Sequence, residues 1–496
     1  MHINRRTFLS ASLAAASATL NQGAFAAPVN PPARWDRTFD VVIVGAGGAG
    51  LAAAVIAVQK GMKALVVEKM AFIGGSSALC GGKWAVCGTD EQIKRGIKDS
   101  PELFLKDMLA TGQNQNDPEL VKAFIKESKE HYDFVTQELG VHPIEVVAAA
   151  GMSVPRAHNF PPATVLNPMY EYVTKRGALV ELSTTAERLV WDPAKGAICG
   201  VICMHEGKKT AIHASKGVIL AAGGFAQNKA MLSKYVPLMA KARVNAGAGN
   251  MGDGIRMAQA YGAEIDDMKY IKATYGYRAD GTPGNLQAYY GGAIIVNKAG
   301  KRFVDESLSY KLIGDAALAQ DEGKSWQLLD ESLRQTRMKV RQSDYRELSP
   351  FDRGEETPHC LRGNTLEEVA KKAGVDPEGL KETVRRYNEN VEKLGRDPDF
   401  GRTSLTSGYG KLIKLETPPF YLFPTTAVLI ATYSGVKITP KAEVLDVFGE
   451  VIPHLYAAGE MTAGIHGAAY MTGSAWGKAM AYGRIAAKSI AQNPPL

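Results

Sequence analysis

The apolar positions near the start of the chain follow the order of a strand, a helix and a second strand. Residues 39–44 form a β-branched run that is typical of a strand buried in a parallel sheet. Residues 51–60 are rich in alanine and predict a helix, and residues 63–67 predict the second strand. Two similar runs, residues 217–222 and 455–458, each lead into glycine. The pattern predicts an α/β fold.

Glycines fill the turn between the first strand and the helix. Gly45, Gly47 and Gly50 have the G-x-G-x-x-G spacing. In such a turn the first glycine permits the tight bend, the second lets backbone approach a pyrophosphate, and the third lets helix pack on strand. The helix N-terminus then faces the phosphates. Because Glu68 ends the second strand, where a carboxylate can accept hydrogen bonds from ribose hydroxyls, these features predict a dinucleotide site.

A second glycine- and serine-rich loop follows at residues 74–82. Its bare backbone is suited to wrap a second part of the same cofactor. The runs that lead into Gly223 and Gly459 repeat the strand-then-glycine design far along the chain. The sequence therefore predicts a Rossmann-like cofactor domain that is discontinuous in the chain.

The composition excludes several other classes. Hydrophobic residues make up 45% and charged residues 22% of the 496 residues, which is ordinary for a globular chain of about two or three domains. The net charge of +7 is mild and no basic block stands out, so we expect no nucleic-acid partner. The five cysteines have no metal-binding spacing, and none lies in the C-x-x-C-H pattern that attaches a haem. We expect no metal site.

The first 26 residues read as an export signal. Arg5 and Arg6 precede a short, weakly apolar stretch at residues 11–20 and an A-x-A cleavage site at residues 24–26. This resembles a twin-arginine (Tat) signal peptide and predicts a periplasmic protein that is exported with its cofactor inserted. The alternative is a chance basic start before an alanine-rich helix. No later stretch of about 18 apolar residues predicts a membrane span.

Further motifs lie along nearly the whole mature chain. They are residues 44–50 with Glu68, 74–82, 100–103, 116–118, 153–158, 220–225, 252–254, 300–306 and 457–476. In these motifs the chain resembles the fumarate reductase and succinate dehydrogenase flavoprotein family, which includes the soluble periplasmic fumarate reductases, the urocanate reductases and the 3-ketosteroid dehydrogenases.

The resemblance implies FAD as cofactor. Members with covalent FAD carry a histidine where this chain reads Gly75-Ser76-Ser77-Ala78, so we expect non-covalent FAD. It also implies an FAD-binding domain at residues 36–272 and 426–496, with an inserted α+β cap domain at residues 273–425 and a substrate cleft between them. The predicted cofactor-binding residues are Gly45, Ala46, Gly47, Gly48, Ala49, Gly50, Glu68, Lys69, Gly75, Ser76, Ser77, Gly81, Gly82, Ala222, Gly223, Gly252, Asp253, Gly459, Glu460, Ser474 and Ala475.

The positions that bind and protonate fumarate in this family are substituted. Tyr310 stands at the position of the acid arginine, and Tyr470 at that of a carboxylate-binding arginine. The other substituted positions are Thr274, Ala431 or Thr432 for two histidines, and Leu286 and Tyr289 for a Glu/Arg proton relay. We therefore do not expect a fumarate reductase.

The 3-ketosteroid dehydrogenases carry tyrosine at both places, so the resemblance predicts Tyr310 and Tyr470 as catalytic residues. Tyr470, with backbone near Gly473 and Ser474, would hold a ketone oxygen and stabilise enolate charge. Tyr310 would exchange the α-proton while flavin exchanges hydride at the β-carbon. The alternative is that both tyrosines are ordinary core or rim residues. The predicted substrate-pocket residues are Trp84, Tyr275, Tyr289, Tyr433 and Gly473.

The leading interpretation is thus an exported FAD oxidoreductase that reduces or forms a C=C bond conjugated to a carbonyl, as in an enone or ketosteroid. An external electron partner, a cytochrome c or a quinone-linked protein, is implied. The first alternative is a reductase of an unsaturated aryl carboxylate, such as a urocanate- or cinnamate-like acid, with Lys311 or Lys437 as the candidate cation. The second is a non-catalytic flavoprotein electron carrier.

Overall fold

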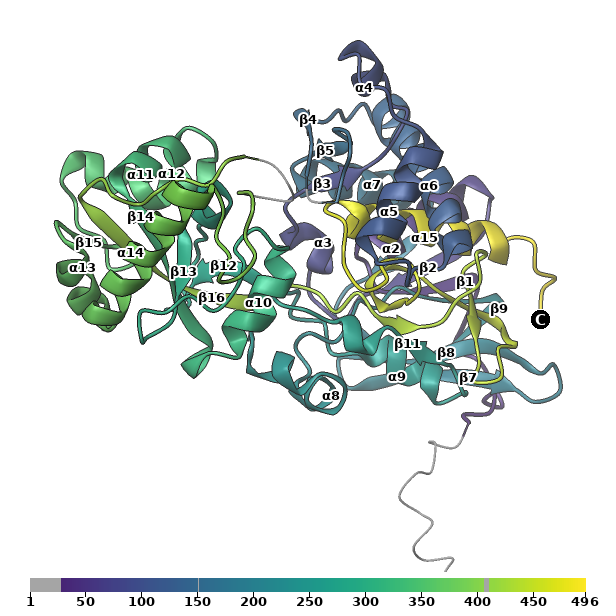
Figure 1. The fold of residues 1–496 in the computed structure, drawn as a ribbon. Coiled ribbons are helices and arrows are strands. Elements are labelled where there is room, and N and C mark those ends of the chain that lie inside the picture. The colour runs from purple at the N-terminus through teal and green to yellow at the C-terminus, as the bar shows by residue number, and fades with distance from the viewer. Residues whose placement is uncertain (1–27, 150, 406–409) are drawn as a thin grey trace, which may run out of the picture. The chain divides into compact units, whose positions relative to one another are not determined.

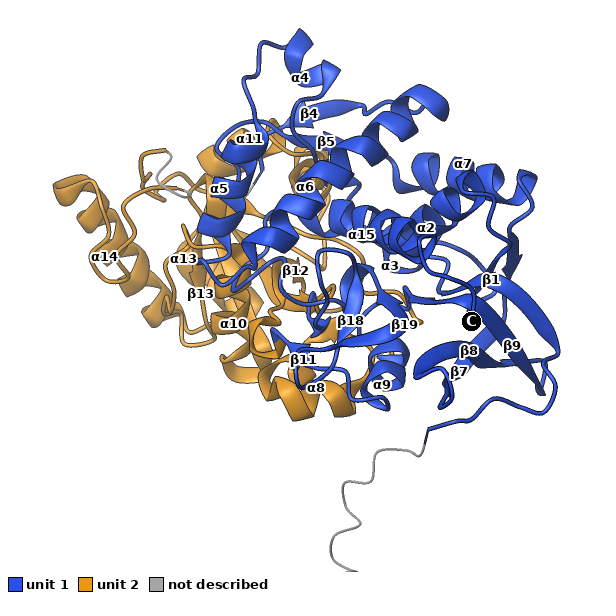
Figure 2. Ribbon diagram, turned by 90° about the vertical axis from the view of Figure 1, so that its right-hand side faces the viewer, with its two compact units in different colours: residues 1–224, 252–267, 433–496 blue, residues 225–251, 268–432 orange. Residues whose placement is uncertain are grey.

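The structure is a computed structural model that describes residues 28–149, 151–405 and 410–496. The chain divides into two compact units (Figure 2). Unit 1 comprises residues 1–224, 252–267 and 433–496, and unit 2 comprises residues 225–251 and 268–432. The predicted cap, residues 273–425, falls inside unit 2. The predicted signal peptide lies outside the described residues.

Unit 1 is built on a sheet whose strand order is β18-β19-β9-β1-β2-β6. The parallel strands are β1 (Arg37–Val44), β2 (Ala64–Val67), β6 (Leu179–Glu181), β9 (Lys208–Leu220) and β19 (Val451–Ala457). The strand β18 (Glu443–Leu445) pairs antiparallel with β19, while β7 (Thr184–Asp192) and β8 (Ala197–His205) extend β9 as antiparallel strands. The β-branched run of β1 is fully buried, as parallel strands require. This confirms the predicted α/β fold.

Two helices of unit 1 pack closely against each other, α2 (Gly48–Gln59) and α15 (Ser474–Ile490) (Figure 1). They approach so closely that a Cβ at Gly483 would lie 2.0 Å from the Ala49 carbonyl oxygen. Glycine is therefore required at this crossing. It brings a helix from the C-terminal end of the chain onto the first helix of the predicted dinucleotide motif.

The rest of unit 1 contains a small three-stranded sheet, β3 (Lys83–Ala85), β4 (Glu145–Val147) and β5 (Ala157–Asn159), with helices α5 (Pro101–Thr111), α6 (Pro118–Asp133) and α7 (Pro162–Lys175). Arg156 is fully buried here and pairs with Asp99 at 2.7 Å and Asp107 at 2.5 Å. This charge cluster ties the segment before β5 to α5 and its N-terminal approach.

Unit 2 is built on a mixed six-stranded sheet around β16 (Phe420–Leu429). The other strands are β10 (Arg243–Val244), β12 (Thr274–Arg278), β13 (Ile294–Val296), β14 (Lys324–Asp330) and β15 (Leu361–Gly363). The helices are α10 (Tyr310–Leu318), α11 (Glu331–Met338), α12 (Gln342–Leu348), α13 (Leu366–Ala373) and α14 (Pro377–Leu394). One apolar core joins strand residues such as Trp326, Leu328 and Leu422 to residues of α13 and α14. Among the described residues, no helix is long and apolar enough to cross a membrane.

Candidate functional site

Four parallel strands of unit 1 end at one edge of the sheet, and each leads into a predicted cofactor turn. Gly45 follows β1, Glu68 follows β2, Ala222 follows β9 by two residues, and Gly459 follows β19 by two residues. Ligands of open parallel sheets bind outside the carboxyl ends of the strands. Every predicted cofactor residue belongs to unit 1, although the residues come from all three of its chain segments.

Of the three motif glycines between β1 and α2, only Gly47 leaves open space beside the main chain for a ligand. A Cβ at Gly45, where φ is +109°, would lie 2.3 Å from the Ala221 carbonyl oxygen, and one at Gly50 would lie 1.8 Å from the Gly45 carbonyl oxygen. Both positions are closed by backbone. A Cβ at Gly47 would meet nothing nearer than 3.7 Å, so a pyrophosphate can approach the main chain there.

The Glu68 carboxylate stabilises this turn through hydrogen bonds from backbone N–H groups. One carboxylate oxygen accepts the Ala46 N–H at 2.8 Å and the other accepts the Met70 N–H at 2.9 Å. The next residue, Lys69, forms a 2.6 Å ion pair with Asp253 at the start of α9 (Asp253–Gln259). The predicted ribose contact of Glu68 stays a prediction. The structure adds that this carboxylate orders the loop through backbone donors.

The second glycine-rich loop is hydrogen-bonded to the first. The Gly74 N–H donates to the Ala46 carbonyl oxygen at 2.9 Å, and the Gly48 N–H donates to Ser77 Oγ at 3.2 Å. Gly82 packs against the residue that follows β5, because a Cβ there would lie 1.8 Å from the Phe160 carbonyl oxygen. The two loops are thus held side by side at the N-terminal end of α2.

Tyr470, in unit 1, belongs to a compact aromatic cluster ahead of α15. Its hydroxyl accepts the Gly473 N–H at 2.8 Å. Its ring stacks on that of Tyr433 with 4.9 Å between centroids and 6° between planes. Tyr433 has a φ of +55°, a strained value for a residue other than glycine. His466 packs edge-on against both rings and lies 3.3 Å, Nδ1 to Oγ, from Ser474.

This arrangement refines the predicted carbonyl anchor. The Tyr470 hydroxyl and the Gly473 N–H were expected to act side by side on one substrate oxygen. In the structure they are linked in series, since the N–H donates to the hydroxyl. A hydroxyl that accepts a hydrogen bond is polarised into a stronger donor. The Gly473 N–H therefore supports Tyr470 in this state.

Tyr310, in unit 2, is the first residue of α10. Ser309 caps this helix, its Oγ accepting the Lys311 N–H at 3.3 Å. The Tyr290 hydroxyl donates to the Leu308 carbonyl oxygen at 2.9 Å and so fixes the segment that leads into Tyr310. Burial raises the pKa of Tyr290, with Tyr310 adding to the effect. Tyr310 is thus presented by a capped helix end beside other phenols.

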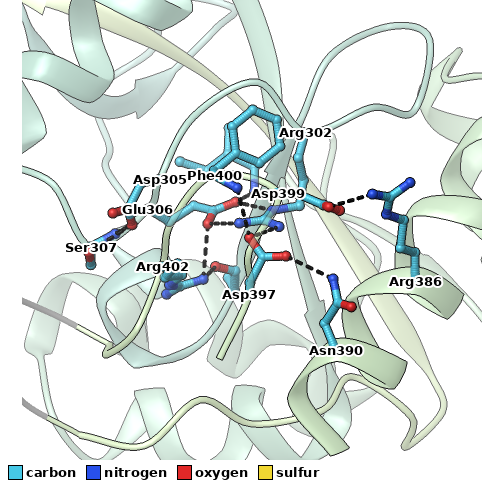
Figure 3. A network of polar contacts seen from close by, with 12 residues as sticks. Arg302, Asp305, Glu306, Ser307, Arg386, Asn390, Asp397, Asp399, Phe400 and Arg402 are labelled. Atoms are coloured by element: carbon cyan, nitrogen blue, oxygen red, sulfur yellow. Dashed lines mark hydrogen bonds and ion pairs between the residues drawn. The ribbon is translucent and has the colours of Figure 1, made fainter. Parts of the chain in front are cut away.

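A buried charge network positions the approach to α10 (Figure 3). Glu306 is bound by Arg302 at 2.6 Å and by Arg402 at 3.1 Å, and Arg302 also binds Asp397 at 2.7 Å. Arg402 donates to the Tyr289 carbonyl oxygen at 2.7 Å. Burial alone would raise the pKa of Glu306, but the two guanidinium groups hold it below its usual range. The network ties three loops of unit 2 together four residues before Tyr310.

Known proteins share this architecture and its sequence. A family model described as "FAD binding domain" matches residues 40–475. Over 461 residues the chain is 34% identical to a fumarate reductase (cytochrome) of Shewanella frigidimarina, and the match covers 92% of this chain and 77% of that protein. The chain belongs to the fumarate reductase flavoprotein family.

Two solved structures extend the comparison. The open conformation of a flavocytochrome c3 fumarate reductase is 29% identical with a TM-score of 0.78, covering 93% of this flavoprotein and 79% of that chain. The 3-ketosteroid-Δ4-(5α)-dehydrogenase of Rhodococcus jostii RHA1 is 27% identical with a TM-score of 0.76, covering 94% and 100%. These findings confirm the predicted family and FAD, and this flavoprotein is an FAD-dependent oxidoreductase acting on C=C bonds.

The residues of unit 1 fit FAD. Besides the open approach at Gly47, the indole Nε1 of Trp476 is buried without a hydrogen-bond partner among the described residues. It faces Gly48, where a Cβ would lie 3.3 Å from Nε1 and 2.9 Å from Ser77 Oγ. A buried N–H aimed at a glycine-rich phosphate turn is a donor suited to the cofactor. Non-covalent attachment stays a prediction.

Three predicted pocket residues are buried in the cores of their units. Trp84 is fully buried in unit 1, and its N–H donates to Ser128 Oγ at 2.8 Å. Tyr275 and Tyr289 are fully buried in unit 2, where their rings pack edge to face. The Tyr275 hydroxyl bonds Ser325 at 2.8 Å, whereas the Tyr289 hydroxyl has no hydrogen-bond partner among the described residues. Their contact with substrate stays a prediction.

Two cations lie near the tyrosines of unit 2, and the sequence indicates Lys311 but not Arg341. Arg341, between α11 and α12, contacts the Gln287 side chain beside Tyr289 and Tyr290. No local motif marks it, because it reaches this place only through tertiary packing. Lys311, one of the two candidate cations for a carboxylate, is only 4% exposed. Lys437, the other candidate, pairs with Glu264 at 3.1 Å and is a surface residue of unit 1.

Proposed function

We propose that this flavoprotein reduces or forms a C=C bond conjugated to a carbonyl, in an enone or ketosteroid-like substrate. The observation that carries the proposal is the Tyr470 cluster. A phenol that accepts the Gly473 N–H and stacks on the strained Tyr433 is fixed and polarised as a donor. Such a donor suits a ketone oxygen better than it suits a carboxylate, which needs a cation.

The two tyrosines have separate tasks. Tyr470 donates to the carbonyl oxygen and stabilises the negative charge that develops there. Tyr310 transfers a proton to or from the α-carbon, which the polarised carbonyl acidifies. FAD, when bound, accepts or supplies the hydride at the β-carbon. In the direction of reduction Tyr310 gives up this proton, and in the direction of dehydrogenation it takes one.

The cellular setting belongs to the same proposal. Arg5, Arg6 and the A-x-A site at residues 24–26 support Tat export to the periplasm. Nicotinamides are scarce outside the cytoplasm, so an external cytochrome c or quinone-linked protein is the proposed electron partner.

The test uses the FAD-loaded protein under anaerobic conditions. After photoreduction, a panel of enones and 3-ketosteroids is added and flavin absorbance is followed. We expect rapid reoxidation by enones, a loss of about 100-fold in Tyr310→Phe and in Tyr470→Phe, and no change in Tyr345→Phe, an exposed tyrosine of unit 2. Wild-type rates in both active-site variants would refute the tyrosine chemistry.

The second candidate function is reduction of an unsaturated carboxylate, and Arg341 is the observation that favours it. Its guanidinium lies beside Gln287 near Tyr289 and Tyr290, where it is suited to hold one carboxylate. Urocanate- and cinnamate-like acids are therefore included in the panel. Reoxidation by acids alone, lost in Arg341→Met and retained in Tyr470→Phe, would support this function. No reoxidation by any compound would favour a non-catalytic electron carrier.

A further inference from the structure

Lys311 is a buried lysine at the inward side of α10. The helix approaches β12 so closely that a Cβ at Gly314 would lie 2.7 Å from the Ala273 carbonyl oxygen. This approach carries Lys311, one turn earlier on the same face, onto the start of β12. There its Nζ donates to Thr274 Oγ1 at 2.8 Å and to the Lys272 carbonyl oxygen at 3.1 Å.

Both of these hydrogen-bond acceptors are neutral oxygens. The nearby carboxylate, Asp315, is bound by Lys272 in an ion pair. Burying a cation against neutral groups is costly, and an apolar side chain at this inward position would cost less. Positions that break the packing rules in this way are expected at functional sites. Its neighbour on the helix is Tyr310, and Lys311 Nζ lies 5.8 Å from the centre of the Tyr310 ring.

We propose that Lys311 is a positioning residue whose ammonium stabilises the phenolate of Tyr310, so that Tyr310 acts as a strong enough acid when the C=C bond is reduced. The inference deepens the proposed function and rests on it. In the reaction, Tyr310 gives its proton to the α-carbon and is left as phenolate. The nearby positive charge offsets that new negative charge, and solvent returns the proton to Tyr310 after the product leaves.

The charge of Lys311 depends on pH in the working range. Burial lowers the pKa of Lys311 to about 7, while Asp315 on α10 raises it and Lys272 ahead of β12 lowers it. The titratable groups that face the pair include Asp315, Lys272 and, on the Tyr310 side, Tyr289 and Tyr290. The ammonium is present below pH 7 and is lost as the pH rises through 7. The rate of reduction should fall over the same interval.

The experiment compares pH–rate profiles of substrate reduction from pH 5.5 to 9 in the FAD-loaded protein. The rate of wild type should decrease above pH 7. The Lys311→Arg variant keeps its positive charge at every pH, so its rate should not decrease over this interval. Lys311→Met should be about tenfold slower at pH 6 and flat through 7. Asp315→Asn removes a charge that raises the pKa of Lys311, so its fall should move to lower pH.

Control measurements distinguish an effect of the Lys311 charge from misfolding of a variant and from failure of the proposed function. FAD content and thermal unfolding of each variant are measured, and the exposed Lys339→Met should match wild type. A fall near pH 7 that persists in Lys311→Arg, or a Lys311→Met profile that overlays wild type, would overturn the inference. An independent readout is the ¹⁵Nζ NMR signal of Lys311, which is assigned because it is absent from the spectrum of Lys311→Arg. In wild type this signal should titrate near pH 7. If no compound is reduced, the proposed function fails, whereas titration near 10.5 overturns the inference alone.

Discussion

At the residue scale, Trp476 gives a test of how FAD is held. Its buried N–H faces Gly48 and Ser77 without a partner among the described residues, and a phosphate oxygen would supply one. Hydrogen bonds to charged groups are worth about 1.5–3 kcal/mol. We therefore expect Trp476→Phe to weaken FAD binding about 10- to 100-fold, measured by titrating FAD-free protein and following flavin fluorescence.

The matched control is Trp326→Phe. Trp326 is also buried, and its Nε1 also lacks a partner among the described residues, but it lies in the core of unit 2. The same chemical change there should leave FAD affinity within twofold of wild type. Equal affinities in Trp476→Phe and wild type would show that the indole N–H does not contact the cofactor.

Some residues of the candidate site can be predicted from the sequence and others cannot. Gly45 and Gly50 are predictable because their spacing follows from backbone geometry that is local to one turn. Tyr310 and Tyr470 are predicted as catalytic residues because of their positions within longer motifs that resemble those of the family. Arg341 could not be found in this way, and Lys311 was a candidate whose burial could not be predicted, because both depend on how α10 and the segment before α12 pack. Local spacing carries no signal of that packing.

At the scale of elements, the charge network before α10 is predicted to stabilise unit 2. Glu306→Gln removes the carboxylate that Arg302 and the fully buried Arg402 share. Breaking a buried pair leaves an uncompensated charge and costs about 3–5 kcal/mol. We expect faster hydrogen exchange in residues 302–310 and 397–402, measured by mass spectrometry, and slower turnover because Tyr310 is less well held.

An exposed ion pair of the same unit provides the comparison. Glu367 pairs with Lys371 at 2.6 Å on α13, and the two side chains are 48% and 66% exposed. Surface pairs of this kind are worth about 0.3–0.5 kcal/mol, so Glu367→Gln should leave exchange and turnover unchanged. If the two variants behave alike, the buried network does not fix the approach to α10.

Whole elements were predictable where their pattern is strong and local. The strand at residues 39–44, the helix after it and the strand at residues 63–67 correspond to β1, α2 and β2. The sheet of β3, β4 and β5 was not predicted, because its strands are three residues long and carry no periodic signal. Residues 225–251 fall in unit 2 rather than unit 1. Contacts with β16 decide that placement, since β10 pairs with it.

At the scale of the whole molecule, FAD binding and folding should be coupled in unit 1 alone. The predicted cofactor turns come from three separate segments of unit 1, and each turn depends on backbone contacts to the next. A ligand that binds only the folded state stabilises it by RT ln(1 + [L]/Kd), about 4 kcal/mol at 1,000 times Kd. Unit 2 has its own apolar core and none of these turns.

Removing FAD is therefore expected to loosen the two units unequally. Hydrogen exchange should rise at residues 45–50, 74–78 and 457–460, while β14 and β16 of unit 2 keep their protection. The thermal midpoint should fall and should recover on adding FAD in proportion to the logarithm of its concentration. Equal loss of protection in β14 and β16 would show that unit 2 needs the cofactor-loaded unit 1 in order to stay folded. Unchanged exchange at the turns would show that unit 1 is already ordered before FAD binds.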